Sequence, residues 1–283
     1  MPDGPDALSV AFRAASFVLL LNAAGISIFI AVFGRLLPDS VPAIAKLGWR
    51  LAIAALVFVA GHHALEAARM AGEMSGVVDP AMQAMTLRSS EGAACALRMV
   101  GLALVAVGLR WRAPAVGIAG AVLAVAAFTL TGHTSVTPYR PAAAALLTLH
   151  LLVVAFWLGS LWPLYLAANR EPPPIAAHLI DAFSRVAAWV VPVILLAGVG
   201  LTVLLVPNWA VFKQPYGQLL LAKGALFAVL MALATLNKWT FGPACASGRT
   251  RAFKQAVAVE YVLICAVLAI TAVLTTFYSP EAP

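Results

Sequence analysis

The stretch AASFVLLLNAAGISIFIAVFG, residues 14–34, decides the fold class of this chain. It runs for 21 residues without a charged side chain, and only Ser16, Asn22 and Ser27 carry polar side chains. The hydrocarbon core of a bilayer is about 30 Å thick, and roughly 20 apolar residues span it as an α-helix. We therefore predict a transmembrane helix over these residues.

Seven further stretches are long and apolar enough to be predicted as transmembrane helices, although some of them contain one or two charged residues. The sequence predicts an all-α fold, a polytopic membrane helix bundle in which residues 1–283 form one integral membrane domain. Short connections with proline or glycine separate the helices. The eight predicted transmembrane helices cover 14–34, 44–65, 92–109, 113–132, 141–168, 186–206, 216–236 and 254–277.

The overall composition agrees with a chain embedded in a lipid bilayer. It is 63% hydrophobic and only 10% charged, with a mean hydropathy of +0.97, so it lacks the polar surface of a soluble globule. The net charge is +7, but Lys and Arg lie singly at the ends of apolar runs. This arrangement does not favour nucleic acid as a partner. The chain contains no GxSxG, HExxH or phosphate-binding loop, so we do not expect an enzyme.

The distribution of Lys and Arg predicts the orientation. The connections that follow the first, third, fifth and seventh helices, with their flanks, carry 11 of the 18 cationic residues, and the other side carries seven. Cytoplasmic loops are enriched in Lys and Arg, so we predict that both termini are periplasmic. The smaller set comprises Arg13, Arg69, Arg88, Arg98, Arg140, Lys213 and Lys223.

The longest polar gap, residues 66–91, is an outer loop rich in methionine. It follows His62 and His63 and carries four of the seven methionines, namely Met70, Met74, Met82 and Met85. Thioether and imidazole groups together suit copper, Cu(I) above all. If the second helix continues outward, His63, Met70 and Met74 share one face, and Met82 and Met85 form a second pair. The alternative is an amphipathic interfacial helix whose methionines rest on lipid.

Two further histidines are candidate metal ligands on the outer side. His133 ends the fourth predicted helix, where it is either a ligand or an ordinary surface histidine. His150 lies nine residues into the fifth helix, about 13 Å below its outer end. An ionisable group at that depth is a functional candidate, although a packing histidine is the alternative. Trp157 shares the face of His150 one level deeper and is expected to form the floor of a polar cavity.

Other polar groups within the predicted spans have structural interpretations. Glu260 is expected to pair with Asn237 or Arg185, which fixes the packing of the last helices. Arg98 and Lys223 lie near outer helix ends, where long side chains can reach the interface.

Several segments of the second half resemble the copper resistance protein D (CopD) family. They are LHLLVVAFWLG at 149–159, FSR at 183–185, YGQLLLAK at 216–223, Asn237 with Pro243, and Val259-Glu260. Thr131-Gly132-His133 resembles the Gly-His element of that family. The resemblance implies a bacterial inner-membrane protein of copper transport or resistance, often accompanied by a periplasmic copper-binding protein of the CopC type. It also implies that His133 and His150 belong to a metal site.

The primary hypothesis is a copper transporter. Copper is captured outside by the methionine loop with His62 or His63, and then passes to a site built from His133 and His150. Neutral imidazole is the competent ligand, so acidification should weaken binding. One alternative is a membrane b-type cytochrome, with haem b held by two of His63, His133 and His150. Another is a non-transporting membrane partner of a periplasmic copper chaperone.

Overall fold

The computed structural model describes residues 4–132, 135, 137–206 and 208–278, and these residues contain helices but no strand. Seven helical segments among them are long and apolar enough to cross a membrane. They are α1 (Gly4–Phe33), α2 (Val41–Ala71), α4 (Ser90–Trp111), α6 (Arg140–Arg170), α7 (Pro173–Leu205), α8 (Pro215–Leu236) with its continuation, and α10 (Arg251–Phe277). The all-helical class is therefore confirmed.

The span predicted at 113–132 is shorter than the others. It forms α5 (Pro114–Ala126) and the 3₁₀ turn η3 (Ala127–Leu130). This apolar helix is just below the roughly 20 residues that a full span needs. Seven long apolar helices are thus confirmed as candidate membrane spans, and the eighth span stays a prediction.

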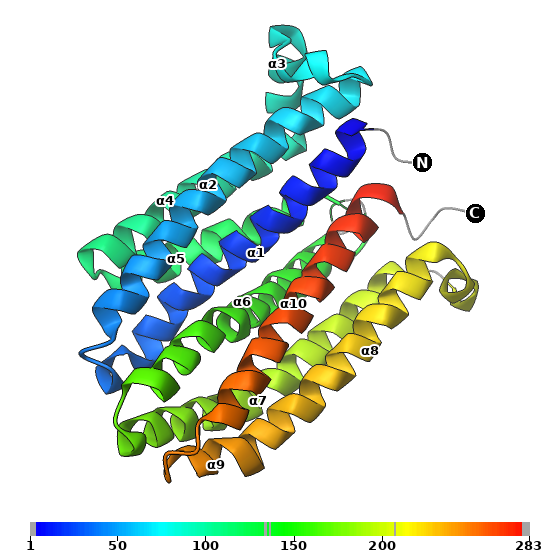
Figure 1. The fold of residues 1–283 in the computed structure, drawn as a ribbon. Helices are drawn as coiled ribbons and strands as arrows, with labels where there is room; N and C mark the ends of the chain where they lie inside the picture. Colours follow the sequence, from blue (N-terminus) through cyan, green and yellow to red (C-terminus); the bar gives the residue numbers. More distant parts are fainter. Residues whose placement is uncertain (1–3, 133–134, 136, 207, 279–283) are drawn as a thin grey trace.

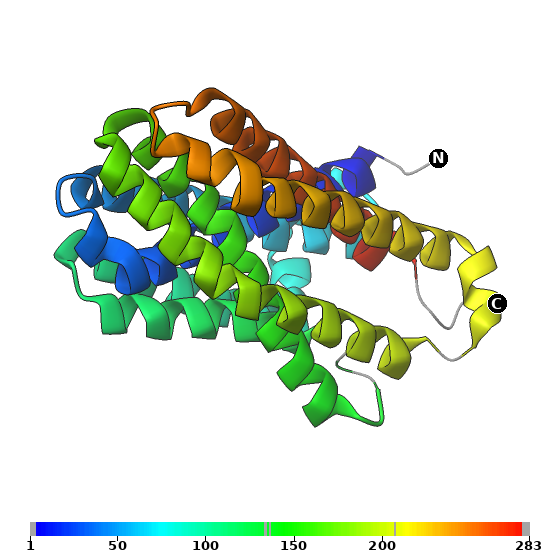
Figure 2. The same ribbon diagram turned by 90° about the horizontal axis from the view of Figure 1, so that it is seen from below.

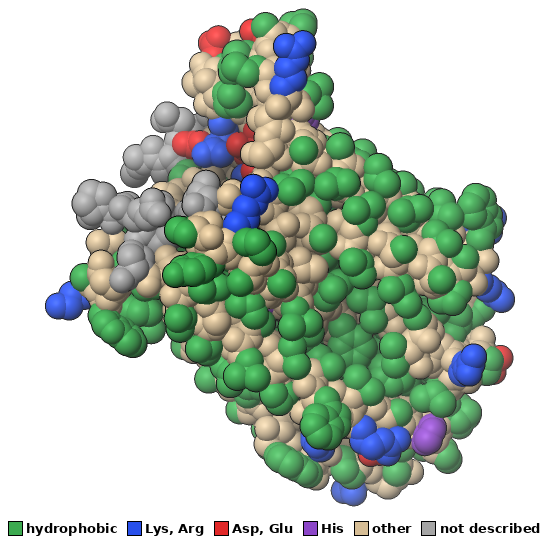
Figure 3. Space-filling view, turned by 180° about the vertical axis from the view of Figure 1, so that it is seen from behind, with side chains coloured by type: hydrophobic (Ala, Val, Ile, Leu, Met, Phe, Trp, Pro, Cys, Tyr) green, Lys and Arg blue, Asp and Glu red, His purple; other side chains and the backbone are tan. Residues whose placement is uncertain are grey.

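The helices lie side by side along one axis (Figures 1 and 2). The first turn of α1 and the last turn of α10 lie at the same end of this bundle, which we call the terminal end. The short helix α3 (Pro80–Leu87) and the 3₁₀ turn η2 (Met74–Val77) also lie there (Figure 1). Figure 3 shows hydrophobic side chains over the flank and charged side chains towards the two ends. This distribution is the one expected of a bundle that sits in lipid.

Several helices extend beyond the apolar runs from which they were predicted. Helix α1 begins ten residues before position 14, and α7 begins at Pro173 rather than at 186. Proline is favourable in the first turn of a helix, where its missing N–H is not needed, so α7 starts directly after the connection from α6. Hydropathy locates the apolar part of a helix, but it does not show where the polar extension of that helix begins.

Helix α1 lies at the centre and joins the two halves of the bundle. It packs against α2 and α5 on one side and against α6 and α10 on the other (Figure 1). A Cβ atom added to Gly25 would lie 1.7 Å from the carbonyl oxygen of Ala155, and one added to Gly159 would lie 2.4 Å from the carbonyl carbon of Gly25. The backbones of α1 and α6 therefore touch, which is how small residues bring membrane helices together.

Candidate functional site

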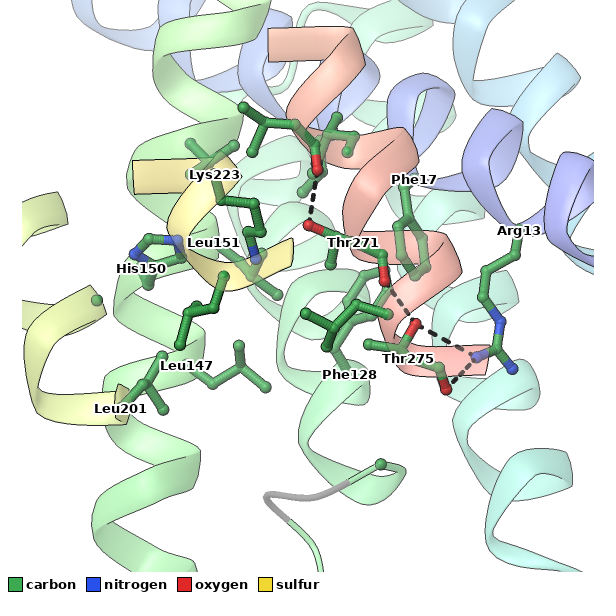
Figure 4. A pocket seen from close by; sticks show the side chains of 18 of the residues that line it. Arg13, Phe17, Phe128, Leu147, His150, Leu151, Leu201, Lys223, Thr271 and Thr275 are labelled. Atoms are coloured by element: carbon green, nitrogen blue, oxygen red, sulfur yellow. Dashed lines mark hydrogen bonds between the residues drawn. The ribbon is translucent and has the colours of Figure 1, made fainter. Parts of the chain in front are cut away.

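A cavity of about 650 Å³ lies in the half of the bundle nearest the terminal end. Its wall is mostly apolar, and Figure 4 shows His150 and Lys223 on one side of it and Arg13 on the other. Residues from both halves of the bundle contribute to the wall. The ionisable side chains that line it are Arg13, His62, Glu66, Arg69, Glu91, Arg98, His150, Tyr216 and Lys223.

A buried ionic network forms one part of this wall. Arg13 donates from Nε to His62 Nε2 at 3.1 Å, and its Nη2 lies 3.4 Å from Glu66 Oε1. Arg69 pairs with the other oxygen of Glu66 at 3.0 Å. Arg13 also donates to the carbonyl oxygen of Thr275 at 3.1 Å, which ties α1 to α10. The network therefore fixes the packing of three helices around the cavity.

The contact with Arg13 defines the protonation state of His62. A guanidinium can only donate, so Nε2 of His62 accepts and the imidazole is neutral. The side chain is 5% exposed. Its Nε2 lone pair is therefore occupied, and His62 can bind a metal ion through this atom only if Arg13 moves away.

Arg98 is buried beside the same network. It was expected to reach the interface, but it is 7% exposed, and its guanidinium lies 4.4 Å from the centre of the Phe128 ring. Nη2 donates to Thr131 at 3.4 Å and Nη1 lies 4.0 Å from Glu91, while Nε has no partner in the described part of the chain. The interfacial position predicted for this residue is wrong, because the cavity offers its charge polar and aromatic partners inside the bundle.

His150 lies on α6 and points into the cavity (Figure 4). Its Nδ1 is 3.3 Å from the carbonyl oxygen of Ile194 on α7. A carbonyl oxygen can only accept, so Nδ1 carries the hydrogen and the neutral ring has its lone pair on Nε2. Histidines that bind metals commonly have this arrangement, with the second nitrogen donating to a backbone carbonyl. His150 can therefore act as a ligand without rearrangement.

Lys223 of α8 lies in the cavity with His150 (Figure 4). Its ammonium group forms no hydrogen bond or ion pair with any residue that the structure describes. Two glycines leave space nearby. A Cβ added to Gly224 would have no atom within 4 Å, and one added to Gly198 would meet only His150, at 3.6 Å.

Trp157 separates this cavity from a smaller one of about 230 Å³ and lines both. Its Nε1 donates to Glu260 Oε2 at 3.2 Å, and Asn237 Nδ2 donates to Glu260 Oε1 at 2.5 Å. The predicted pairing of Glu260 with Asn237 is confirmed, whereas Arg185 pairs with Asp181. Trp157 occupies the floor position predicted for it, but the wall of the cavity is mostly apolar rather than polar.

The methionines gather at the terminal end, outside the cavity. Helix α2 continues to Ala71, so His63 and Met70 lie on one helix, but Gly72 (φ 77°) ends it and Met74 begins η2. The predicted single stripe that includes Met74 is therefore wrong, because a left-handed glycine terminates the helix.

A short helix brings two more methionines back towards α2. Met82 and Met85 lie on α3, where Thr86 Oγ1 is 3.6 Å from the sulfur of Met70 and 2.9 Å from the carbonyl oxygen of Met82. Met70 and Met85 are about half exposed. The thioethers are thus accessible from outside the bundle.

The remaining candidate ligands are not brought together in the described residues. His63 is not among the residues that line the cavity, and its Nε2 is buried without a described partner. His133 lies outside the described residues, so its predicted pairing with His150 stays a prediction. No group of three His, Cys, Asp or Glu residues within the described ranges could hold a metal ion. The haem hypothesis also stays a prediction, which a visible absorption spectrum would test.

Sequence reasoning did not identify the charged side of the cavity. Arg13 precedes the first apolar run, and Glu66 and Glu91 are the first and last residues of the methionine loop, so all three lie at the ends of predicted spans. Their clustering depends on which helices are neighbours. The available signal was that charges on three separate segments fall at the same predicted depth.

Comparisons with known proteins cover most of the chain. A family model described as copper resistance protein D matches residues 177–274, and one described as copper resistance protein D-like, N-terminal domain, matches residues 1–138. The chain is 27% identical over 270 residues to copper resistance protein D of Pseudomonas syringae pv. tomato, which covers 84% of each chain.

A second relative is considerably longer than this chain. The copper transport protein CutJ of Bacillus subtilis is 29% identical over 178 residues, which is 61% of this chain. The matched part is only 32% of the Bacillus protein, so the chain spans about a third of that relative. No solved structure matches the chain.

Proposed function

This chain belongs to the copper resistance protein D family, and on that premise we propose that it captures copper at the terminal end and transports it across the membrane. It is a multi-pass membrane protein with a copper-related role. The proposal has two specific parts. Methionine and histidine capture copper, and the metal then passes through the bundle by way of His150.

The position of the methionines carries the proposal. Met70 at the end of α2 lies against α3, which presents Met82 and Met85, and Met74 lies in the connection between them. Four flexible thioethers on one exposed segment form a soft ligand set that favours Cu(I) over harder cations. His63 precedes Met70 by seven residues, or nearly two turns, on the same helix. It is the imidazole that we assign to this set.

The charge distribution supports a periplasmic terminal end in a bacterial inner membrane. Of the seven Lys and Arg residues predicted for that side, Arg13, Arg69, Arg98 and Lys223 line the cavity. Only Arg88, Arg140 and Lys213 are exposed there. At the opposite end ten of eleven are exposed, and Lys254 is partly buried. The bias on the surface is therefore stronger than in the sequence, as the positive-inside rule requires.

The route inward begins at the cavity. His150 has a neutral ring with Nε2 available, and Gly132, which lines the cavity, is followed in the sequence by His133. We assign these two histidines to the inner site. His62 joins them only when Arg13 releases its Nε2. Below His150, the contact of Trp157 with Glu260 closes the path to the second cavity.

Copper flux into proteoliposomes tests the proposal. We expect vesicles with the wild-type protein to fill an entrapped Cu(I) chelator faster than protein-free vesicles. Replacing Met70, Met74, Met82 and Met85 by leucine should slow uptake by about tenfold at limiting copper and much less at saturating copper. The control is Met99→Leu, a methionine on α4 outside this segment.

The outcomes distinguish transport from docking. If wild-type vesicles fill no faster than empty ones, transport is excluded, and the exposed methionines fit a docking surface for a periplasmic copper-binding protein of the CopC type. If the fourfold variant transports like the wild type at limiting copper, the methionines do not capture the metal.

A further inference from the structure

Among the residues that the structure describes, none forms an ion pair with the ammonium group of Lys223. Lys223 belongs to α8, a helix long enough to span the membrane, and its side chain lines a mostly apolar cavity. It forms no hydrogen bond or ion pair within the described ranges. An unpaired charge in such surroundings is strongly unfavourable, and intramembrane lysines almost always have a partner. The partner of Lys223 is therefore a group that the described residues do not supply.

The ionisable side chains that line the cavity carry a net positive charge, like Lys223 itself. Four cationic side chains line it against two carboxylates, Glu66 and Glu91. Glu66 accepts from both Arg13 and Arg69, and Arg69 also pairs with Asp6 at 2.9 Å. Glu91 lies 4.0 Å from Nη1 of Arg98, so the positive charge left without a described carboxylate is that of Lys223. Such a cavity attracts an anion.

The rest of the wall suits a hydrocarbon chain. Leu147, Leu151, Leu220 and Phe227 line the cavity near Lys223 and His150. A volume of about 650 Å³ lies within the range of ligand pockets, and a small inorganic anion would leave this apolar wall unfilled. Gly224, one residue after Lys223, leaves open space where a side chain would otherwise stand.

The cavity also extends to the flank of the bundle. Leu195 and Val199 of α7 line it and are 51% and 53% exposed. Helix α7 has little contact with α8, although the two are consecutive in the chain. An acyl chain can therefore enter between these helices from the bilayer, with its polar end towards Lys223.

We propose that this cavity binds an amphipathic anion, a lipid-type molecule with a carboxylate or phosphate headgroup and a long hydrocarbon chain. Lys223 pairs with the headgroup, and the leucine and phenylalanine wall covers the chain. This site does not depend on the copper function proposed above, because its ligand is recognised by charge and hydrocarbon alone.

Ligand binding in nanodiscs of neutral phosphatidylcholine tests the site. The probe is a dansyl-labelled long-chain fatty acid, whose fluorescence rises in an apolar pocket. Wild-type protein should bind it saturably, and Lys223→Gln should weaken binding by about tenfold, because a charge-assisted hydrogen bond is lost. Gly224→Leu should abolish binding by filling the cavity. The matched controls are Lys213→Gln, at an exposed lysine, and Gly224→Ala, whose added Cβ meets nothing.

Competitors identify the source of the anionic group. Oleate and phosphatidylglycerol should displace the probe, whereas a fatty alcohol of equal length and inorganic phosphate should do so at least about tenfold less well. Binding that is non-saturable, or unchanged in both Lys223→Gln and Gly224→Leu, would overturn the site. Equal competition by the alcohol would overturn the role of charge, and equal competition by inorganic phosphate would overturn the role of the chain.

Discussion

Trp157 on α6 donates its indole hydrogen to Glu260 on α10, with 3.2 Å between Nε1 and Oε2 and 103 residues between them in the sequence. Asn237, in the π-helical turn η6 (Asn237–Phe241), donates to the other carboxylate oxygen. Each oxygen of a buried carboxyl group thus has a donor, which offsets the cost of removing it from water. Three segments of the second half meet at this group, which lines the smaller cavity, and Trp157 lines both cavities.

Replacing Trp157 by phenylalanine should destabilise the protein. A smaller aromatic ring replaces the indole, and Oε2 of Glu260 loses its donor, which costs about 1–3 kcal/mol besides the cost of the lost volume. Thermal unfolding in detergent should show a lower Tm than that of the wild type. The control is Trp162→Phe, at a residue that is 44% exposed and forms no hydrogen bond in the described part of the chain. Equal Tm values for the two variants would show that the contact does not stabilise the fold.

The two kinds of ion pair in this chain should respond very differently to mutation. Arg13→Met removes the donor to Nε2 of His62 and one of the donors to the carboxylate of Glu66, which should cost about 1–3 kcal/mol. Arg185→Met breaks an exposed pair with Asp181 and should cost about 0.5 kcal/mol or less. Denaturant unfolding at low and at high salt measures both. A loss for Arg13→Met that disappears in 1 M salt would contradict the buried character of the network, because only exposed pairs are strongly screened.

The contact between α1 and α6 should not tolerate a single methyl group. Gly159→Ala places a Cβ 2.4 Å from the backbone of Gly25, so the two helices must separate, at a cost of about 2 kcal/mol or more. Gly224→Ala adds the same atom where nothing lies within 4 Å and should be neutral or slightly stabilising. Thermal stability in detergent compares the two variants. If Gly159→Ala is as stable as Gly224→Ala, the halves are not joined by this backbone contact.

The parts of this structure that sequence reasoning predicted depend on local pattern. Each apolar run forms a helix, because a membrane helix satisfies all its backbone hydrogen bonds within the segment. The pairing of Glu260 with Asn237 was also predictable, since a carboxyl group inside a bundle must find a donor. The residue at which α2 ends was not predictable from the sequence. Gly72 stops the helix before Met74, and one glycine in a polar stretch does not show which conformation it adopts.

The cavity could not be predicted, because it depends on neighbours rather than on sequence distance. Arg13 contacts His62 across 49 residues and Thr275 across 262. Arg98 turns inward only because Phe128 and Thr131 lie beside it. The count of Lys and Arg residues placed Arg13 and Arg98 at the outer membrane boundary. It gave their depth in the bilayer, but not whether their side chains point into the bundle or out of it. Likewise, the sequence does not show that Lys223 lacks an ion-pair partner among the described residues, because this depends on which residues line the cavity.

Copper binding at His150 and anion binding at Lys223 should be coupled, because both groups line one cavity. The excess positive charge there opposes a copper cation, and a bound anionic headgroup offsets it. Copper affinity should therefore be about tenfold higher in nanodiscs with anionic lipid than in neutral nanodiscs, a coupling of ordinary size that linkage makes reciprocal.

Two variants separate the parts of this coupling. Lys223→Gln should raise copper affinity in neutral nanodiscs and remove the lipid dependence, with Lys213→Gln as control. His150→Ala should lower the affinity in both lipids, because Nε2 is lost as a ligand. Competition with a Cu(I) chelator measures every case. If His150→Ala keeps wild-type affinity and stoichiometry, His150 does not bind copper. If the wild type shows no lipid dependence while His150→Ala is impaired, the metal site stands and its coupling to the anion is excluded.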